Sequence, residues 1–211
     1  MPTPADQTRP ADKARATNQK LPTGKTRPGG AERLLAAGTL SVAATLLTGT
    51  VALYISLVAF GNITDFDSNQ QFVRHVLAMD TTFKDDDLMW RAVGSTALQD
   101  TAYVAIIVWE TLAGLVLLTA TVLWAGALRR PQGLRRARRT GTIGLLMILV
   151  LFGAGFIGIG GEWFAMWQSE DWNGLDAATR VVTLAGLVLL VTHLPSAAAP
   201  ADDSSGPEEN A

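Results

Sequence analysis

The sequence predicts an all-α protein: a four-helix transmembrane bundle with short interfacial helices on its extracytoplasmic side. Of the 211 residues, 48% are hydrophobic, and they are concentrated in four long runs at about 34–60, 101–128, 142–159 and 177–194. Each run is near or above the roughly 20 residues that an α-helix needs to cross a hydrocarbon core of about 30 Å. A helix is expected because it satisfies its own backbone hydrogen bonds where no water is present.

Positive charge predicts the orientation of the four spans. Of the 17 Lys and Arg residues, seven precede the first run and six lie in the basic loop RRPQGLRRARR, residues 129–139, between the second and third runs. Because cytoplasmic segments retain Lys and Arg during insertion, we expect a multi-pass protein of a bacterial cytoplasmic (inner) membrane, with both termini cytoplasmic. We interpret the basic loop as a topology determinant on the anionic leaflet and expect no nucleic-acid partner.

The two ends of the chain are predicted to be disordered cytoplasmic tails. Residues 1–33 are polar and basic, and residues 195–211 are polar and acidic, so neither has enough apolar surface to offset its conformational entropy. The first run is much longer than the core of a cleaved signal peptide and follows a long polar segment, which indicates a signal anchor.

The first connector, residues 61–100, is expected to hold two short helices. Ser68 and Gln71 have the spacing of a capping box, so Asp67 or Ser68 is the predicted N-cap of an amphipathic helix on the membrane surface or on the bundle. Its apolar stripe follows helical spacing and consists of Phe72, Val76, Met79 and Phe83. A second short helix is expected after the acidic run at 85–87. It would direct Leu88, Met89 and Trp90 inward.

The second connector, residues 160–176, contains three of the six tryptophans in the stretch GGEWFAMWQSEDWNG. The third span is predicted to end at Gly160-Gly161, after which Trp163, Phe164 and Trp167 would share one helical face at the headgroup boundary, where indole rings are favoured. An aromatic belt accounts for those rings. It does not account for the polar residues interleaved with them, which are Glu162, Gln168 and Asn173.

Glu110 is the one ionisable residue in the middle of an apolar run. It lies about nine residues into the second span, roughly 13 Å deep at 1.5 Å per residue, where an ionised carboxylate costs at least about 2.5 to 3.5 kcal/mol. Two routes reduce this cost: an ion pair with Arg180, near the outer end of the fourth span, or protonation of Glu110. The acid is then either structural or a proton-titrating or cation-binding group in a cavity open to the outside.

Metal and cofactor sites have weak support. Asp65, Asp67, His75 and Asp80 offer hard ligands for a divalent ion, but charged loop residues are usually only solvated, and we predict no metal. His75 and His193 are expected at opposite ends of the bundle, so they cannot jointly hold a haem, and we predict no cofactor.

The stretch GAGFIG, residues 153–158, matches a dinucleotide-binding pattern but lies inside a predicted span with no preceding strand. We interpret its small residues as a close helix contact, like Ser41, Thr45 and Gly49 in the first span.

Four motifs carry a resemblance to a known family: NITDFDSNQQFVRHVLAMDTTF (62–83), MWRAV (89–93), IIVWET (106–111) and GGEWFAMWQSEDWNG (160–174). With them, residues 38–194 resemble a bacterial family of predicted small integral membrane proteins, a domain of unknown function with four transmembrane helices. The resemblance implies a four-helix inner-membrane protein and brings no activity or cofactor.

The sequence thus favours a non-enzymatic accessory, sensor or ligand- or partner-binding module with its site on the extracytoplasmic face. The expected partners are membrane lipids and a membrane protein or a second copy of the chain. The alternative is a small transporter or membrane enzyme in which Glu110 handles a proton or a cation. The candidate functional residues are Glu110, Arg180, Glu162, Trp163, Trp167, Gln168, Asn173, Asp65, Asn69, His75 and Asp80.

Overall fold

The computed structural model describes residues 30–194, in which four helices are long and apolar enough to cross a membrane. They are α1 (Gly30–Thr64), α3 (Thr96–Arg129), α4 (Leu134–Leu149) with its continuation η3 (Val150–Trp163), and α5 (Leu175–His193). No strand occurs in this part of the chain. The prediction of an all-α membrane bundle is therefore confirmed. The expected tails lie almost entirely outside the described residues, although α1 already begins at Gly30.

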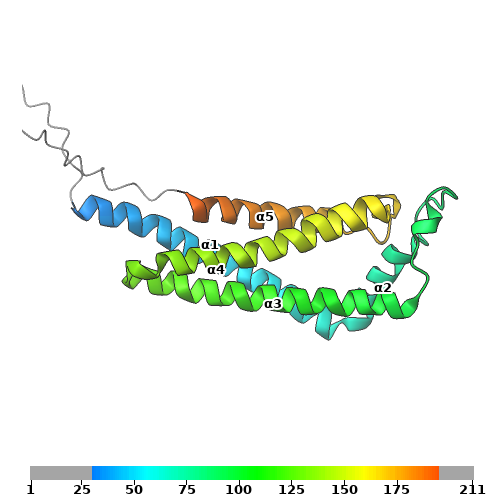
Figure 1. Ribbon diagram of the computed structural model, residues 1–211, viewed down its shortest axis with the longest axis horizontal. Helices are drawn as coiled ribbons and strands as arrows, with labels where there is room; N and C mark the ends of the chain where they lie inside the picture. The colour runs from blue at the N-terminus through cyan, green and yellow to red at the C-terminus, as the bar shows by residue number, and fades with distance from the viewer. Residues whose placement is uncertain (1–29, 195–211) are drawn as a thin grey trace, which may run out of the picture.

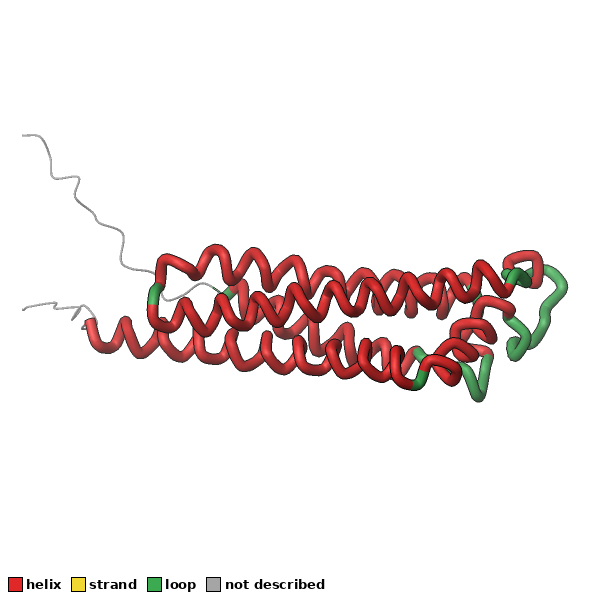
Figure 2. The backbone as a smooth tube through the Cα atoms, turned by 90° about the horizontal axis from the view of Figure 1, so that it is seen from below, coloured by secondary structure: helices red, strands yellow, loops and turns green. Residues whose placement is uncertain are grey.

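The long helices run alternately up and down, so consecutive helices are antiparallel (Figure 1). Helix α3 packs along α1 and α4, and α5 packs along α4 and η3. The start of α1, the α3–α4 turn and the end of α5 lie at one end of the bundle, which we call the termini end. Both connectors lie at the other, the connector end, where all the longer loops gather (Figures 1 and 2).

The core of the bundle is largely apolar. Between the two ends, its main cluster consists of buried side chains from all four long helices, among them Ile55, Leu117, Leu145 and Val188. Nearer the termini end, Trp124 packs with Ala44 and Ala137. The outward faces are apolar as well and carry many exposed leucines and valines, as expected for helices surrounded by lipid.

Glycines bring some of these helices unusually close. A Cβ added at Gly144 of α4 would lie 2.6 Å from Leu117 Cγ of α3, and one added at Gly49 of α1 would lie 3.2 Å from Thr121 Cγ2. The close contact expected at Gly49 is therefore confirmed. At Gly153 an added Cβ would lie 3.9 Å from Val182 Cγ2 of α5, whereas at Gly155 and Gly158 it would meet only atoms of its own helix. The contact expected across GAGFIG is therefore present at Gly153 and wrong at the other two glycines.

The third span differs from the others because its second half is not an α-helix. After Leu149 it continues as the π-helix η3, with i→i+5 hydrogen bonds such as the 3.0 Å bond from Phe164 N to Ile159 O. It ends at Trp163, so the predicted end at Gly160-Gly161 is too early. The glycines of GAGFIG lie within this wider helix. The π-helix is rare, and where it occurs as single turns inside α-helices it is frequent at functional sites.

The first connector contains the expected amphipathic helix, α2 (Phe66–Ala78), but its start differs from the prediction. Its N-cap is Asp65, and the Ser68 hydroxyl donates a 2.7 Å hydrogen bond to Asp65 Oδ1 instead of capping the helix. The second predicted helix is a single 3₁₀ turn, η1 (Met89–Arg91). Leu88 and Met89 are half-buried, whereas Trp90 is 69% exposed, so its expected inward direction is wrong.

Candidate functional site

Glu110 lies on α3, inside the bundle, with only 1% of its surface exposed. Its Oε2 accepts a 2.7 Å hydrogen bond from Asn62 Nδ2, near the end of α1. The Tyr103 hydroxyl donates a 2.8 Å bond to the Asn62 backbone oxygen. Tyr103 and Glu110 are seven residues apart on α3, so they share a helix face two turns apart. Both therefore reach the same residue of α1.

The ion pair considered between Glu110 and Arg180 is not formed. Arg180 is exposed on α5, and the ion pairs found within residues 30–194 join Arg74 to Asp100 and His75 to Asp80. The protein therefore supplies Glu110 with a neutral amide donor. A neutral donor compensates a carboxylate less than a cation does.

A cavity of about 270 Å³ lies beside Glu110, which we call the polar cavity. Its polar wall consists of Tyr54, Asn62, Asn69, Tyr103 and Glu110, and the rest of its lining is apolar. Residues from α1, α2, α3, η3 and α5 contribute to it, so it lies between the α1–α3 pair and the η3–α5 pair. A mostly apolar cavity with a few convergent polar groups is typical of a small-molecule site.

Helix α2 covers the cavity at the connector end. Two hydrogen bonds from Arg74, at 2.7 and 2.8 Å, hold both carboxylate oxygens of Asp100, near the start of α3. These bonds stabilise the charged guanidinium and raise the pKa of Arg74 above its usual value. Gln70 Nε2 adds a 2.9 Å bond to Asp100 Oδ1. The amphipathic helix is thus fixed to the bundle by its polar side as well as by its apolar stripe.

The ring of Phe72 anchors α2 on the opposite side. A Cβ added at Gly174 would lie 2.9 Å from Phe72 Cζ, so the ring occupies the space that a side chain at 174 would need. Phe72 also lies near Phe156 of η3, with ring centroids 6.4 Å apart. The glycine before α5 therefore permits the close approach of α2.

His75 and Asp80 form a second polar pair at the connector end. His75 Nδ1 lies 2.9 Å from both carboxylate oxygens of Asp80, and its ring stacks on Trp172 at 4.6 Å between centroids. Asp65 is engaged with Ser68, as described above. No group of three His, Asp or Glu side chains that would suit a metal ion occurs in the described part of the chain. The metal set considered from the sequence is thus not assembled.

The aromatic residues of the second connector do not share one helical face. Phe164 is 7% exposed, whereas Trp163 and Trp167 are 46% and 51% exposed. The chain reverses between them, because Ala165 has a left-handed backbone conformation with φ of 50°. Trp163 packs edge-on against Trp90, with the guanidinium of Arg91 4.9 Å from the Trp163 ring centroid.

The polar residues of the second connector tie the two connectors together. Gln168 Oε1 accepts a 2.9 Å hydrogen bond from the backbone N–H of Phe83, and Ser169 Oγ accepts one of the same length from Thr81. Asn173 Oδ1 accepts a 3.1 Å bond from Leu175 N at the start of α5. Glu162 is exposed. Gln168 and Asn173 therefore shape the loops of the connector end.

The structure brings two of the predicted residues, Glu110 and Asn69, to the polar cavity. The others lie at the surface or in the connectors. Sequence reasoning missed Asn62 and Tyr103, the residues that complete the hydrogen-bonded chain at Glu110. A signal for both exists: Asn62 is a polar residue directly after the first apolar run, and Tyr103 precedes Glu110 by two helical turns.

Four apolar spans that surround one buried acid define the chain as an integral membrane protein with a polar group inside its bundle. The family described as "Predicted small integral membrane protein (DUF2165)" matches residues 40–195, and the chain belongs to this family. The resemblance seen in the sequence is therefore confirmed. No curated protein and no solved structure matches the chain.

Proposed function

We propose that this protein is a non-enzymatic ligand-binding module of a bacterial cytoplasmic membrane, acting as a sensor or accessory subunit. Its site is the polar cavity, entered from the connector end, which faces away from the cytoplasm. The observation that carries the proposal is the 2.7 Å bond between Asn62 and a buried acid that has no ion-pair partner within residues 30–194.

A purely structural role explains this arrangement less well. A structural acid in a membrane is either paired with a cation or protonated and bonded to a neighbouring helix, and neither arrangement calls for a cavity. Here one neutral donor bonds one oxygen of Glu110, and a cavity of about 270 Å³ lies beside the side chain. A ligand in this cavity would lie within reach of the acid, which supports a binding role for Glu110.

The charge distribution supports the direction of entry. The basic loop at 129–139 is at the termini end, and Lys and Arg favour the cytoplasmic side. The exposed aromatic rings at the opposite end, which include Phe83, Trp90 and Trp167, suit contact with the lipid headgroups or with a membrane-protein partner or second copy of the chain.

The test is purification in mild detergent followed by mass spectrometry of bound small molecules. We expect a molecule that accompanies the native protein and is lost from Glu110→Gln and from Ala177→Leu, which narrows the cavity at its exposed rim. The matched control is Thr179→Leu, an exposed site on the same helix outside the lining. If all four proteins fold and carry the same bound molecules, the proposal is wrong.

The alternative function is proton or cation transport through Glu110. It is favoured by the position of Glu110 near the middle of α3, about 21 Å from Thr96 at 1.5 Å per residue. In reconstituted vesicles, a transporter shows a flux that Glu110→Gln abolishes while the protein still folds. A binding module shows no flux in either form.

A further inference from the structure

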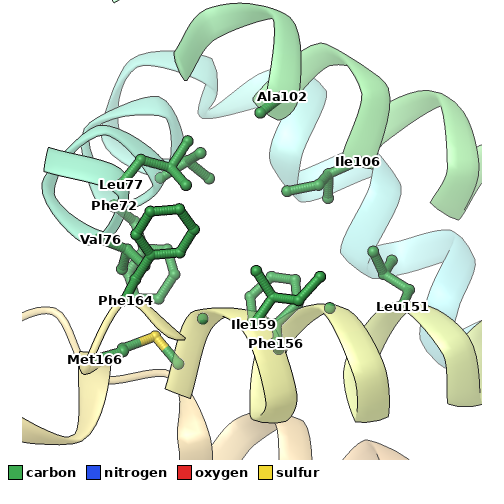
Figure 3. A pocket seen from close by; sticks show the side chains of 13 residues that line it. Phe72, Val76, Leu77, Ala102, Ile106, Leu151, Phe156, Ile159, Phe164 and Met166 are labelled. Carbon is green, nitrogen blue, oxygen red and sulfur yellow. The ribbon is translucent and has the colours of Figure 1, made fainter. Parts of the chain in front are cut away.

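A second cavity, of about 160 Å³, lies next to the polar cavity and has no polar side chain in its lining. We call it the apolar cavity. Helices α2, α3 and η3 enclose it, with Ala102 and Ile106 reaching in from α3 and Phe156 and Ile159 from η3 (Figure 3). An apolar cavity of this size is large enough to accept hydrocarbon.

The two cavities share one wall, formed by Phe72, Val73, Ile106 and Phe156. Phe72 and Val73 are the part of this wall that is supplied by the covering helix α2, and of the two only Phe72 is half-buried. A displacement of the Phe72 side chain would open this wall and join the two spaces into one elongated site. One end of that site is polar, and the other is apolar.

Glu110 is the one charged residue in the lining of either cavity. A cationic ligand is therefore complementary to the site, whereas an anion would meet a carboxylate with no base beside it. A metal ion fits poorly, because one carboxylate and two amides provide too few strong oxygen ligands for a hard cation. An organic ammonium group needs one carboxylate and a neighbouring acceptor, which Glu110 and the Asn62 side-chain oxygen provide.

We propose that the joined cavities bind an alkylammonium ligand, with its nitrogen at Glu110 and Asn62 and its hydrocarbon chain in the apolar cavity. This inference rests on the proposed function and adds the chemical class of the ligand. The ammonium supplies the cation that Glu110 lacks within the described residues, and the hydrocarbon chain of the ligand fills the apolar cavity. The ligand enters beneath α2 from the connector end.

The test is equilibrium dialysis of radiolabelled decylamine, decanol, decanoate and methylamine against the full-length protein in mild detergent, with detergent alone subtracted. We expect saturable binding of decylamine, roughly tenfold tighter than that of decanol or decanoate, because a charged hydrogen bond is stronger than a neutral one. Glu110→Gln removes this preference. Equal binding of decylamine and decanol would overturn the proposal.

The placement of the ligand's hydrocarbon chain in the apolar cavity is tested with variants of α3. Ala102→Leu narrows the apolar cavity and is expected to weaken decylamine binding about fivefold while leaving methylamine binding unchanged. Ala105→Leu, at an exposed site of the same helix, is the control and leaves both unchanged. If Ala102→Leu does not change the affinity for decylamine, the hydrocarbon chain of the ligand lies elsewhere and its placement in the apolar cavity is wrong.

The outcome also separates this inference from the function on which it rests. If no amine binds saturably, yet the purified protein carries a different molecule that Glu110→Gln loses, the ligand class is wrong and the binding function stands. If neither is found in folded protein, both are wrong.

Discussion

Glu110 is held in the bundle by an amide, and this determines what the residue can do. The side-chain amide of Asn62 donates to one carboxylate oxygen of Glu110. The hydroxyl of Tyr103 in turn donates to the backbone oxygen of Asn62 and holds that residue in place. A cation at this position would make the acid inert, because a buried ion pair is hard to separate. The amide orients the acid and leaves its second oxygen available to a ligand.

The coupling of Asn62 and Glu110 is measurable. Asn62→Leu is expected to destabilise the protein by about 1 to 3 kcal/mol, because it leaves a buried acid without its donor. Combining it with Glu110→Leu removes both groups, so the double variant should lose less stability than the sum of the single variants. The measurement is reversible unfolding in mixed detergent micelles. Strictly additive losses would show that the bond contributes nothing.

Gly144 offers a test of packing at a single position. Gly144→Ala places a Cβ 2.6 Å from Cγ of Leu117, a fully buried side chain. We expect a loss of about 1 to 3 kcal/mol in the free energy of unfolding, typical of an overpacked core. Gly186→Ala, which has no other atom within 4 Å of its added Cβ, is the control and should not destabilise the protein. Equal stability of the two variants would contradict the close contact of α3 and α4.

The importance of Glu110 could be predicted from the sequence, but its partner could not. A single acid in an apolar run is visible by inspection, and Arg180 lies at a suitable depth along its helix. Depth alone does not give the direction of a side chain, which turns by about 100° per residue in a helix of 3.6 residues per turn. Ala178 and Val181 face the core, so Arg180 between them faces outward.

Helix α2 closes the connector end through a few identifiable contacts. Its existence and amphipathic character follow from the spacing of its apolar residues, as predicted. Its start could not be predicted, because Ser68 bonds the Asp65 side chain and not the backbone. The π-helix η3 could not be predicted either. When every face of a helix is apolar, the spacing of its apolar residues does not indicate which type of helix it forms.

The attachment of α2 to α3 can be weakened selectively. Arg74→Gln removes both bonds of the guanidinium to Asp100. Because the pair is partly exposed, the global stability should fall by less than about 1 kcal/mol, whereas amide hydrogen exchange across residues 66–78 should become faster. Lys84→Gln, which removes an exposed charge without an ion pair in the described residues, is the control. Unchanged exchange in α2 would mean that its apolar face alone holds it.

The molecule as a whole is a bundle whose two ends differ in charge and in packing. The number of spans and their approximate bounds follow from the apolar runs. The relative arrangement of the spans could not be derived, because apolar helices in lipid have no preferred face until small residues such as Gly144 allow close contact. The position of the polar cavity depends on that arrangement and was equally inaccessible from the sequence.

The orientation of the molecule can be tested by cysteine labelling, since the chain has no cysteine. Asp86→Cys and Glu170→Cys lie at exposed positions of the two connectors, and Gln132→Cys lies in the basic loop. In intact cells, a membrane-impermeant maleimide should label the first two and reach the third only after the cells are permeabilised. Labelling of Gln132→Cys from outside would reverse the orientation and place the entrance to the polar cavity on the cytoplasmic side.

The tightly filled segment around Leu117, Leu145 and Ile148 separates Glu110 from the termini end. A ligand that entered beneath α2, as proposed, would meet this apolar layer and would have to leave on the same side. Its occupancy at equilibrium would then report its concentration in one compartment only, as a sensor requires. Transport would require the buried layer around Leu117 to open during each cycle.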